Sequence, residues 1–257
     1  MTGTDLIRTD ISDSKLAGRI AETAGKILLQ LRDSKLFDGK ALGKIGDATA
    51  NTFIMSALQF HRPQDAILSE EEKDSAARLS ISRVWIVDPL DGTREYGESR
   101  SDWAVHIALS IDGEPRVGAV ALPGLAMTLN SAHAPKPPRA ASKPRMLVSR
   151  TRPAHEALAV AEKLGADLVP MGSAGAKAMA VLRGEADIYL HSGGQYEWDS
   201  CAPVAVALAA GLHVSRIDGS ACLYNRENPY MPDLLICLPE FAQPVLKALK
   251  EILPPTT

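Results

Sequence analysis

A buried strand that ends in two carboxylates is the part of this sequence best suited to chemistry. Residues 84–87 form a β-branched and aromatic run, which predicts a strand that stops at Asp88. Asp91 follows, and two such carboxylates are costly unless a cation neutralises them; Mg²⁺, which prefers oxygen ligands, would do so. Gly92 and Thr93 would present backbone N–H groups at a helix start, which suits a phosphate. The segment therefore predicts metal-assisted phosphate chemistry.

Three further acids stand where apolar segments begin or end. Glu70 follows the apolar run 66–69, Asp199 lies in the first turn of a predicted helix, and Asp47 stands where another helix would begin. Capping and helix-dipole stabilisation are the ordinary explanations for the two aspartates. A solvated turn is the ordinary explanation for the triplet 70–72. Sites are commonly built where such junctions meet at one sheet edge, so the acids are also candidates for one shared metal site.

Hydrophobic periodicity divides the chain into two halves that position these residues. The segment 134–144 is rich in proline and predicts a linker between an N-terminal half, 1–133, and a C-terminal half, 145–257. The first half is expected to hold helices over 13–32 and from 47, a mobile loop or hairpin over 36–46, and an antiparallel meander with strands at 103–110, 116–122 and 126–131. The second half alternates strands at 146–149, 168–170 and 186–190 with helices at 153–164, 174–183 and 200–210, which predicts an α/β layer.

Composition excludes several classes of protein. The 257 residues carry 28 basic and 31 acidic side chains with no long basic run, so binding to a nucleic acid polymer is not expected. No apolar run has the length of a membrane span, and residues 1–5 show no signal-peptide pattern. The three widely spaced cysteines predict buried small side chains in a reducing cytoplasm, and the six histidines show no metal-ligand spacing.

Taken together, the motifs resemble the inositol monophosphatase superfamily of Mg²⁺-dependent, lithium-inhibited phosphatases. They are Ser69-Glu70-Glu71, Asp88-Pro89-Leu90-Asp91-Gly92-Thr93, Gly172-Ser173-Ala174 and Trp198-Asp199. The resemblance extends over nearly the whole chain. It implies a layered α/β/α/β/α sandwich with the site between the two halves. Within the superfamily, the segments 68–71, 88–96 and 172–180 look most like the bacterial 3′-phosphoadenosine 5′-phosphate phosphatases of the CysQ type, in particular the actinobacterial ones.

The resemblance also assigns roles to matching positions. It implies one Mg²⁺ held by Glu70, Asp88 and the Leu90 carbonyl, a second held by Asp88, Asp91 and Asp199, and a weaker third near Glu70 and Asp47. Two such ions, roughly 3.5–4 Å apart, can clamp the attacking and leaving oxygens of a phosphate ester. Thr93, oriented by Asp47 and assisted by Glu70, would help to activate water. Substrate contacts are implied for the residues Leu90, Asp91, Gly92, Thr93, Gly172, Ser173, Lys177 and Asp199.

Two positions depart from the inositol branch of the family. Ser192 stands seven residues before Asp199, where that branch carries an acid that contacts an inositol hydroxyl, and Asn51 replaces a glutamate near the third metal. The expected reaction is therefore release of the 3′-phosphate from 3′-phosphoadenosine 5′-phosphate, which clears a by-product of sulfate activation. Hydrolysis of inositol 1-phosphate or fructose 1,6-bisphosphate is the alternative reaction.

Two plainer interpretations remain open for the substrate residues and for the protein. Ser173 can be a helix cap and Lys177 a solvated lysine. A non-catalytic nucleotide or metal sensor is an alternative of another class, although Asp88, Asp91, Thr93 and Asp199, one of which such a protein would be expected to lack, are all present. A cytoplasmic homodimer is expected from the relatives.

Overall fold

The computed structural model describes residues 11–253; residues 1–5, which enter the signal-peptide prediction, lie outside this range. Two long helices, α1 (Asp13–Asp33) and α2 (Gly39–His61), precede a five-stranded sheet. Its strands lie in the order β1 (Ala66–Ser69), β2 (Arg83–Asp91), β3 (Ala104–Ile111), β4 (Glu114–Leu122) and β5 (Met127–Asn130). β1 pairs with β2 in parallel and the other pairs are antiparallel, so the predicted meander is present. The short helix α3 (Thr93–Gly97) follows β2 directly.

The second sheet is mixed and has the strand order β7-β6-β8-β10-β9. Its strands are β6 (Arg145–Ser149), β7 (Asp167–Met171), β8 (Ile188–Tyr196), β9 (His213–Ser215) and β10 (Tyr230–Cys237). The helices between and after them are α4 (His155–Leu164), α5 (Ala174–Leu182), α6 (Glu197–Ala210) and α7 (Pro239–Ile252).

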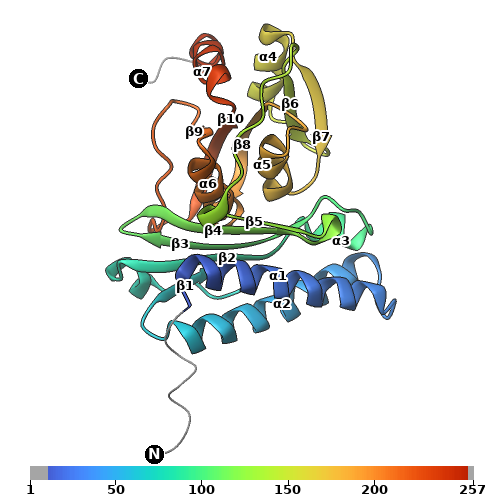
Figure 1. The fold of residues 1–257 in the computed structure, drawn as a ribbon, viewed down its shortest axis with the longest axis vertical. Helices are drawn as coiled ribbons and strands as arrows, with labels where there is room; N and C mark the ends of the chain where they lie inside the picture. The colour runs from blue at the N-terminus through green and yellow to red at the C-terminus, as the bar shows by residue number, and fades with distance from the viewer. Residues whose placement is uncertain (1–10, 254–257) are drawn as a thin grey trace, which may run out of the picture.

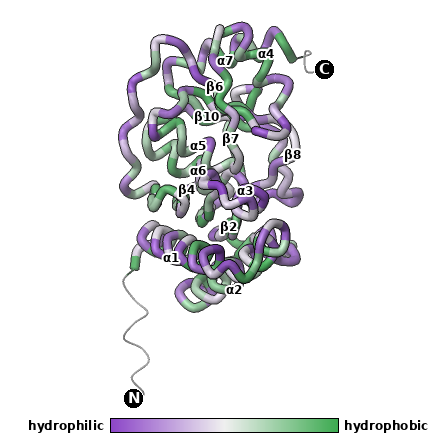
Figure 2. The backbone as a smooth tube through the Cα atoms, turned by 90° about the vertical axis from the view of Figure 1, so that its right-hand side faces the viewer, coloured by the Kyte–Doolittle hydropathy of each residue, from purple (hydrophilic) through white to green (hydrophobic). Residues whose placement is uncertain are grey.

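The elements stack in five layers, as the resemblance implies. Figure 1 shows α1 and α2 below the first sheet, α5 and α6 between the sheets, and α4 and α7 beyond the second sheet. In Figure 2, turned by 90°, α1 and α2 again form one end of the molecule and α4 and α7 the other. Three apolar clusters fill the spaces between the layers. The middle cluster joins both sheets through α5 and α6, so the two halves share one core.

Two predicted boundaries around the acids are wrong. The segment 36–46, expected as a loop or hairpin, contains the first turns of α2, and Asp47 lies inside that helix rather than at its start. Two of its glycines are packing positions: a Cβ at Gly43 would lie 2.8 Å from Thr93 Cγ2, and one at Gly46 would lie 2.8 Å from the Tyr96 ring. Glycine in a helical pattern was therefore misread as a turn signal.

The strand β2 also runs further than predicted. It continues through Asp88 to Asp91, and its pairing with β3 shifts register between these two residues. Such an irregularity re-aims side chains and is common beside functional sites. Here it lets both carboxylates belong to one strand. The strand β10, which lies between β8 and β9, and the helix α7 were not predicted at all.

Other sequence expectations agree with the structure. The three cysteines, Cys201, Cys222 and Cys237, are buried and free. In the described part of the chain, no helix is both long enough and apolar enough to cross a membrane.

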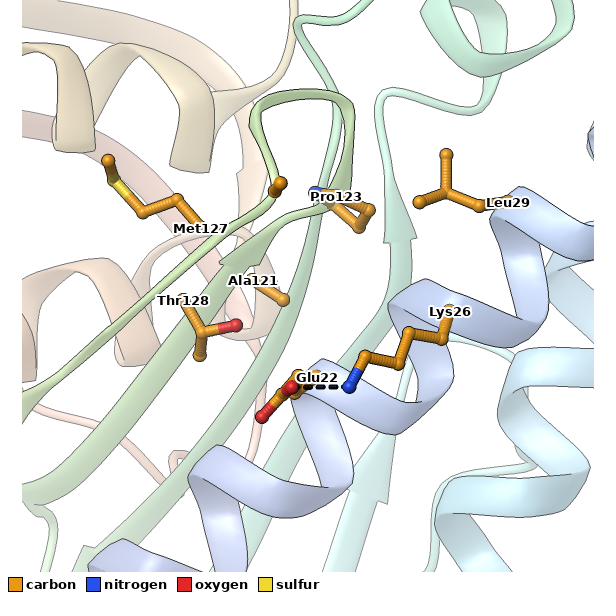
Figure 3. Close-up of a pocket in the computed structure, with 8 residues that line it drawn as sticks. Glu22, Lys26, Leu29, Ala121, Pro123, Met127 and Thr128 are labelled. Atoms are coloured by element: carbon orange, nitrogen blue, oxygen red, sulfur yellow. Dashed lines mark hydrogen bonds and ion pairs between the residues drawn. The ribbon is translucent and has the colours of Figure 1, made fainter.

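A cavity of about 400 Å³ lies between α1 and the strands β4 and β5, where Glu22 and Lys26 form an ion pair (Figure 3). The acids discussed above do not line it.

Candidate active site

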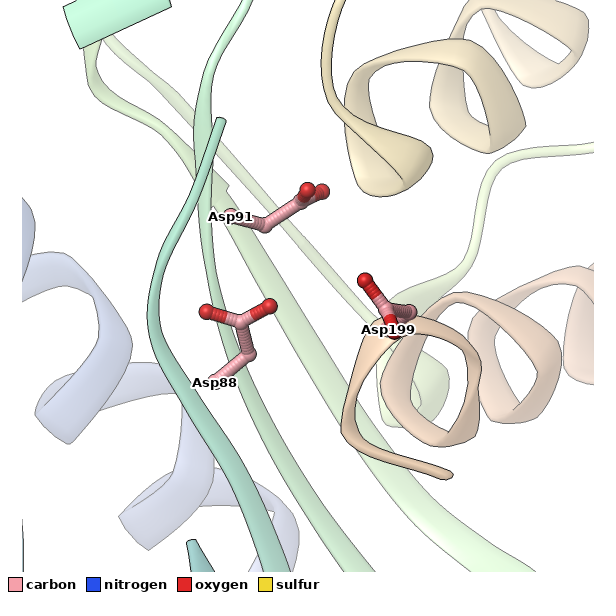
Figure 4. Close-up of side chains that lie close together, drawn as sticks. All are labelled: Asp88, Asp91 and Asp199. Atoms are coloured by element: carbon pink, nitrogen blue, oxygen red, sulfur yellow. The ribbon is translucent and has the colours of Figure 1, made fainter. Parts of the chain in front are cut away.

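Three of the predicted metal ligands converge between the first sheet and the middle helical layer. One carboxylate oxygen from each of Asp88, Asp91 and Asp199 lies within 4.8 Å of the others. Figure 4 shows the first two on β2, with Asp199 facing them from the first turn of α6. Asp88 and Asp91 are almost wholly buried. Carboxylates 111 residues apart in the chain thus meet at one point, where like charges repel unless a cation or protons intervene.

Local hydrogen bonds fix two of these carboxylates and leave acceptor sites free. Asp88 Oδ1 accepts from the Leu90 backbone N–H at 3.0 Å, and Asp199 Oδ2 accepts from the Tyr196 N–H at 2.7 Å. Burial, followed by repulsion from Glu70 and Asp91, raises the pKa of Asp88 well above its ordinary value. Burial and repulsion from Asp91 raise the pKa of Asp199 to about 7. A bound cation would relieve both effects.

Asp91 differs because donors surround its carboxylate. Oδ2 accepts from Ser173 Oγ at 2.5 Å and from the Gly175 N–H at 2.7 Å, and Oδ1 accepts from the Ala174 N–H at 3.1 Å. These groups form the N-terminus of α5, whose free N–H groups favour a negative charge. Although burial opposes ionisation, His106 and Ser173 outweigh it and lower the pKa of Asp91 to about 2. The middle helix α5 therefore holds this ligand ionised.

Ser173 links a strained backbone to this arrangement. Its φ is +40°, a region that residues other than glycine seldom adopt. Its hydroxyl accepts from the Ala176 N–H at 3.0 Å, so the predicted helix cap is present, and it also donates to Asp91. Strain of this kind concentrates at functional sites.

Asp47 and Thr93 meet beside the cluster. Thr93 Oγ1 lies 3.0 Å from the Leu90 carbonyl oxygen and 3.4 Å from Asp47 Oδ2, so its single proton can be donated to either. Asp47 is 7% exposed, and its Oδ1 is buried without a hydrogen-bond partner. Burial and the charge of Glu71 raise the pKa of Asp47 to about 7. The pair brings a hydroxyl and a proton acceptor together.

Glu70 lies at the end of β1 and is more open to solvent than the three clustered aspartates. Desolvation by the neighbouring protein, and repulsion from Asp47 and Asp91, raise its pKa to about 7. Among residues 11–253, the carboxylate of Glu70 is not one of the three whose oxygens lie within 4.8 Å of one another. Asn51, which replaces an acid of the inositol branch, instead donates to Glu72 at 2.7 Å and accepts from Ser69 at 2.9 Å.

A cavity of about 560 Å³ opens beside the cluster. Seven of the eight predicted substrate contacts line it, and Leu90 does not; the seven are Asp91, Gly92, Thr93, Gly172, Ser173, Lys177 and Asp199. Lys177 is 5% exposed rather than solvated, and its Nζ donates to the carbonyl oxygens of Gly172 and Ser173. Burial lowers the pKa of Lys177, although nearby carboxylates oppose this.

Sequence reasoning missed several residues of this site. Arg94, Arg150 and Arg152 line the cavity. Arg150 pairs with Glu95 at 2.9 Å, whereas Arg152 forms no ion pair with any residue of 11–253. His106 lies in a strand, β3, as its apolar neighbours predict, but its burial against Asp91 was not predicted from the sequence. A histidine within the apolar run 103–109 was the available signal.

The donor set fits a hard divalent cation. The clustered atoms are carboxylate oxygens, which Mg²⁺ prefers, and Asp47 adds a buried oxygen with no other partner. The raised pKa values of Asp88 and Asp199 show that this part of the protein holds more negative charge than it neutralises by itself.

Comparison with known proteins places this geometry in a family. Residues 15–253 match the model of the inositol monophosphatase family. A 3′-phosphoadenosine 5′-phosphate phosphatase of Mycobacterium leprae is 44% identical, with 95% of this chain and 96% of the relative covered. A protein of the same name from Mycobacterium tuberculosis is 49% identical, with 89% and 90% covered.

Solved structures of inositol monophosphatase-family proteins share this fold. The crystal structure of CysQ from Bacteroides thetaiotaomicron, a bacterial member of the inositol monophosphatase family, matches with a TM-score of 0.79 at 24% identity. That match covers 88% of this chain and 97% of the other. An inositol monophosphatase from Anabaena matches with a TM-score of 0.76 at 22% identity, covering 94% and 96%. The chain therefore belongs to the inositol monophosphatase family.

Proposed function

We propose that this protein is a Mg²⁺-dependent phosphatase that removes the 3′-phosphate of 3′-phosphoadenosine 5′-phosphate, giving AMP and phosphate. The observation that carries the proposal is the cavity in which Asp91, Asp199 and Thr93 share one space with Arg150 and Arg152. Members of the family are metal-dependent phosphatases, and the relatives at 44–49% identity bear the name of this reaction.

The metal ligands proposed are those expected from the sequence. Asp88, Asp91 and Asp199 would hold one Mg²⁺, and Asp88, Glu70 and the Leu90 carbonyl a second. When bound, Mg²⁺ offsets the charge of the phosphate and lowers the pKa of water. The Leu90 oxygen accepts one hydrogen bond, from Thr93, and so keeps a second lone pair for a ligand bond. A third ion beside Asp47 would be weaker, because Asn51 supplies no charge there.

Thr93 and Asp47 supply the proton path. Thr93 Oγ1 would accept a proton from the attacking water while its own proton passes to Asp47 Oδ2, 3.4 Å away, with Glu70 assisting. The water oxygen bonds to phosphorus as the bond from phosphorus to the 3′-oxygen breaks, and the released alkoxide takes a proton from solvent. The backbone N–H groups of Gly92 and Thr93 would hold the phosphate oxygens.

The substrate choice depends on the cationic side of the cavity. A nucleotide with two phosphates leaves one phosphate away from the metal cluster, and that phosphate needs a cation of its own. The exposed guanidinium of Arg152 is suited to this contact because no carboxylate of the described chain occupies it. Ser192, where the inositol branch carries an acid, donates to Glu156 at 2.5 Å and so is already engaged.

The proposed function also involves both halves of the chain, a cellular compartment and an assembly state. The segments 1–133 and 145–257, joined by 134–144, would act as two interdependent halves, because Asp88 and Asp91 come from the first and Asp199 from the second. The protein would work in the cytoplasm, where its free cysteines stay reduced. It would form a homodimer, as the family resemblance implies.

The test is phosphate release from four substrates at equal concentration, with Mg²⁺ and with EDTA. They are 3′-phosphoadenosine 5′-phosphate, 3′-AMP, inositol 1-phosphate and fructose 1,6-bisphosphate. We expect kcat/KM for the bisphosphorylated nucleotide to exceed the values for the other substrates by about tenfold or more, because the contact with its second phosphate is charge-assisted and worth about 1.5–3 kcal/mol. EDTA should abolish release. Preference for the inositol or sugar phosphate would overturn the substrate assignment.

Arg152→Gln isolates the second phosphate. We expect KM for 3′-phosphoadenosine 5′-phosphate to rise about tenfold and KM for 3′-AMP, which lacks the second phosphate, to stay unchanged. Arg139→Gln, at an exposed arginine outside the cavity, is the matched control. Equal losses on both nucleotides would refute the role of Arg152 and leave the reaction itself standing.

A further inference from the structure

A buried histidine touches both sides of the metal cluster. His106 lies on β3, in the first sheet, and its side chain is fully shielded from solvent. Neither the expected ligand set nor the proton path through Thr93 includes it. A fully buried imidazole needs polar partners, so its two nitrogens identify what it does.

One ring nitrogen faces Asp91. Nε2 lies 3.2 Å from Asp91 Oδ2, an ion-pair distance, but the two atoms are not aligned for a hydrogen bond, and no other group of the described chain bonds to this nitrogen. The same oxygen accepts from Ser173 and Gly175. Three groups therefore surround Oδ2, whereas Oδ1 accepts only from the Ala174 N–H, at 3.1 Å, among the described residues and keeps a lone pair for a cation.

The other ring nitrogen reaches the helix that carries Asp199. Nδ1 lies 3.1 Å from the carbonyl oxygen of Trp198, the residue immediately before Asp199 in the first turn of α6. A carbonyl oxygen only accepts hydrogen bonds, so Nδ1 carries a proton and donates it. One rigid ring thus joins Asp91 on β2 to the backbone beside Asp199.

The start of α5 packs directly against the ring. A Cβ on Gly175, at the start of α5, would lie 2.0 Å from His106 Nε2. That distance is far inside any real contact, so α5 can approach β3 only because residue 175 is glycine. The ring is thereby held between β3, α5 and the first turn of α6.

We propose that His106 is a positioning residue that sets the distance and orientation of Asp91 relative to Asp199 and so tunes the affinity of the site for its divalent cation. Groups that orient metal ligands commonly change metal affinity by about 10- to 100-fold when they are replaced. The inference rests on the proposed function only in requiring that Asp91 and Asp199 hold the cation.

Two amide variants separate the two contacts. His106→Gln places an amide nitrogen near the position of Nε2 and keeps an N–H group facing Asp91. His106→Asn places one near Nδ1 and keeps only the contact with Trp198. His213→Asn, on the edge strand β9, is the matched control, because that histidine contacts only Ser215 and lies outside the cavity.

The readout is direct binding of Mn²⁺ to the full chain, followed by the electron paramagnetic resonance signal of the free ion. We expect His106→Asn to raise the Kd for Mn²⁺ by about 10- to 100-fold, and His106→Gln to stay within about threefold of the wild type. His213→Asn should match the wild type. Urea unfolding in EDTA reports stability separately from binding.

Clear outcomes would overturn the inference. Equal losses of affinity in the Asn and Gln variants would mean that the ring only fills space, and unchanged affinity in the Asn variant would mean that Asp91 needs no support. If the Asn variant does not fold, Gly175→Ala, which displaces the ring while keeping it, should produce the same loss of affinity; normal binding would refute the proposal. Failure of the wild type to bind Mn²⁺ would instead refute the metal site of the proposed function.

Discussion

Removing the cation should make the stability of this protein fall as pH rises, and Asp47 provides the sharpest test. In the metal-free protein, burial and the charge of Glu71 raise its pKa from 3.8 to about 7. Below pH 4 the carboxyl is protonated in the folded and unfolded chains and costs nothing. Between pH 4 and pH 7 the unfolded chain ionises and the folded chain does not, so the folded state loses stability with rising pH.

The size of the effect follows from the same pKa values. A rise from 3.8 to about 7 corresponds to about 4 kcal/mol once pH exceeds both values, because each pKa unit is worth about 1.4 kcal/mol. Asp47 is 7% exposed, so solvent screening reduces this figure little. Most of the change, about 3 kcal/mol, should occur between pH 5 and pH 8.

The assay is urea unfolding at pH 5, 6, 7 and 8, in EDTA and in excess Mg²⁺, for the wild type and Asp47→Asn. The amide cannot ionise, so in EDTA the variant should gain about 3 kcal/mol on the wild type across this range. Asp47 also raises the pKa values of Glu70 and Asp88, so the difference between the two proteins includes the relief of that repulsion. Titrating groups that Asp47 does not perturb cancel in the difference. Excess Mg²⁺ should shrink the difference, because a nearby cation favours ionised Asp47. Parallel pH curves for the two proteins in EDTA would refute the reasoning.

Two further predictions concern the reaction. Thr93→Ala should lower kcat by about 10²- to 10³-fold and change KM little, since it removes a positioned proton-transfer group, whereas Thr93→Ser should retain much of the activity; an unchanged kcat in the alanine variant would remove Thr93 from the mechanism. Asp88→Asn and Asp91→Asn should both abolish phosphate release, and activity in either would contradict the metal assignment. Only Asp91→Asn should also lower the free energy of unfolding, by roughly 2–3 kcal/mol, because its amide nitrogen would face N–H and O–H donors; circular dichroism during urea unfolding would separate the two variants.

The order of elements was predictable from the sequence because local patterns determine it. The strands β3, β4 and β5, and the alternation from β6 to α6, follow hydrophobic periodicity, and the structure places them within a few residues of the expected bounds, except that β8 continues six residues further, to Tyr196. The start of α2 was not predictable in this way. Gly43 and Gly46 indicate a helix break when the sequence is considered alone. In the structure they are glycine because Thr93 and Tyr96 pack against them. Tertiary contacts of this kind override local propensity.

The site shows the same division between local and distant information. The carboxylates of β2 could be found from sequence because a charge that ends an apolar run is conspicuous. His106 and Arg152 could not, because their roles depend on what lies opposite them in space. A single histidine in a strand carries no metal-ligand spacing, and only the folded chain shows that it contacts Asp91 and the backbone next to Asp199.

The two middle helices explain why such a site needs both halves of the chain. α5 presents its first N–H groups to Asp91, and α6 carries Asp199 in its first turn. Both helices therefore begin at the cluster, and both belong to the apolar core that joins the two sheets. Since that core fixes the separation of the sheets, it also fixes the separation of the carboxylates. The same burial that stabilises the fold thus holds the acids close enough to repel one another, and a divalent cation is the ligand that such a geometry favours.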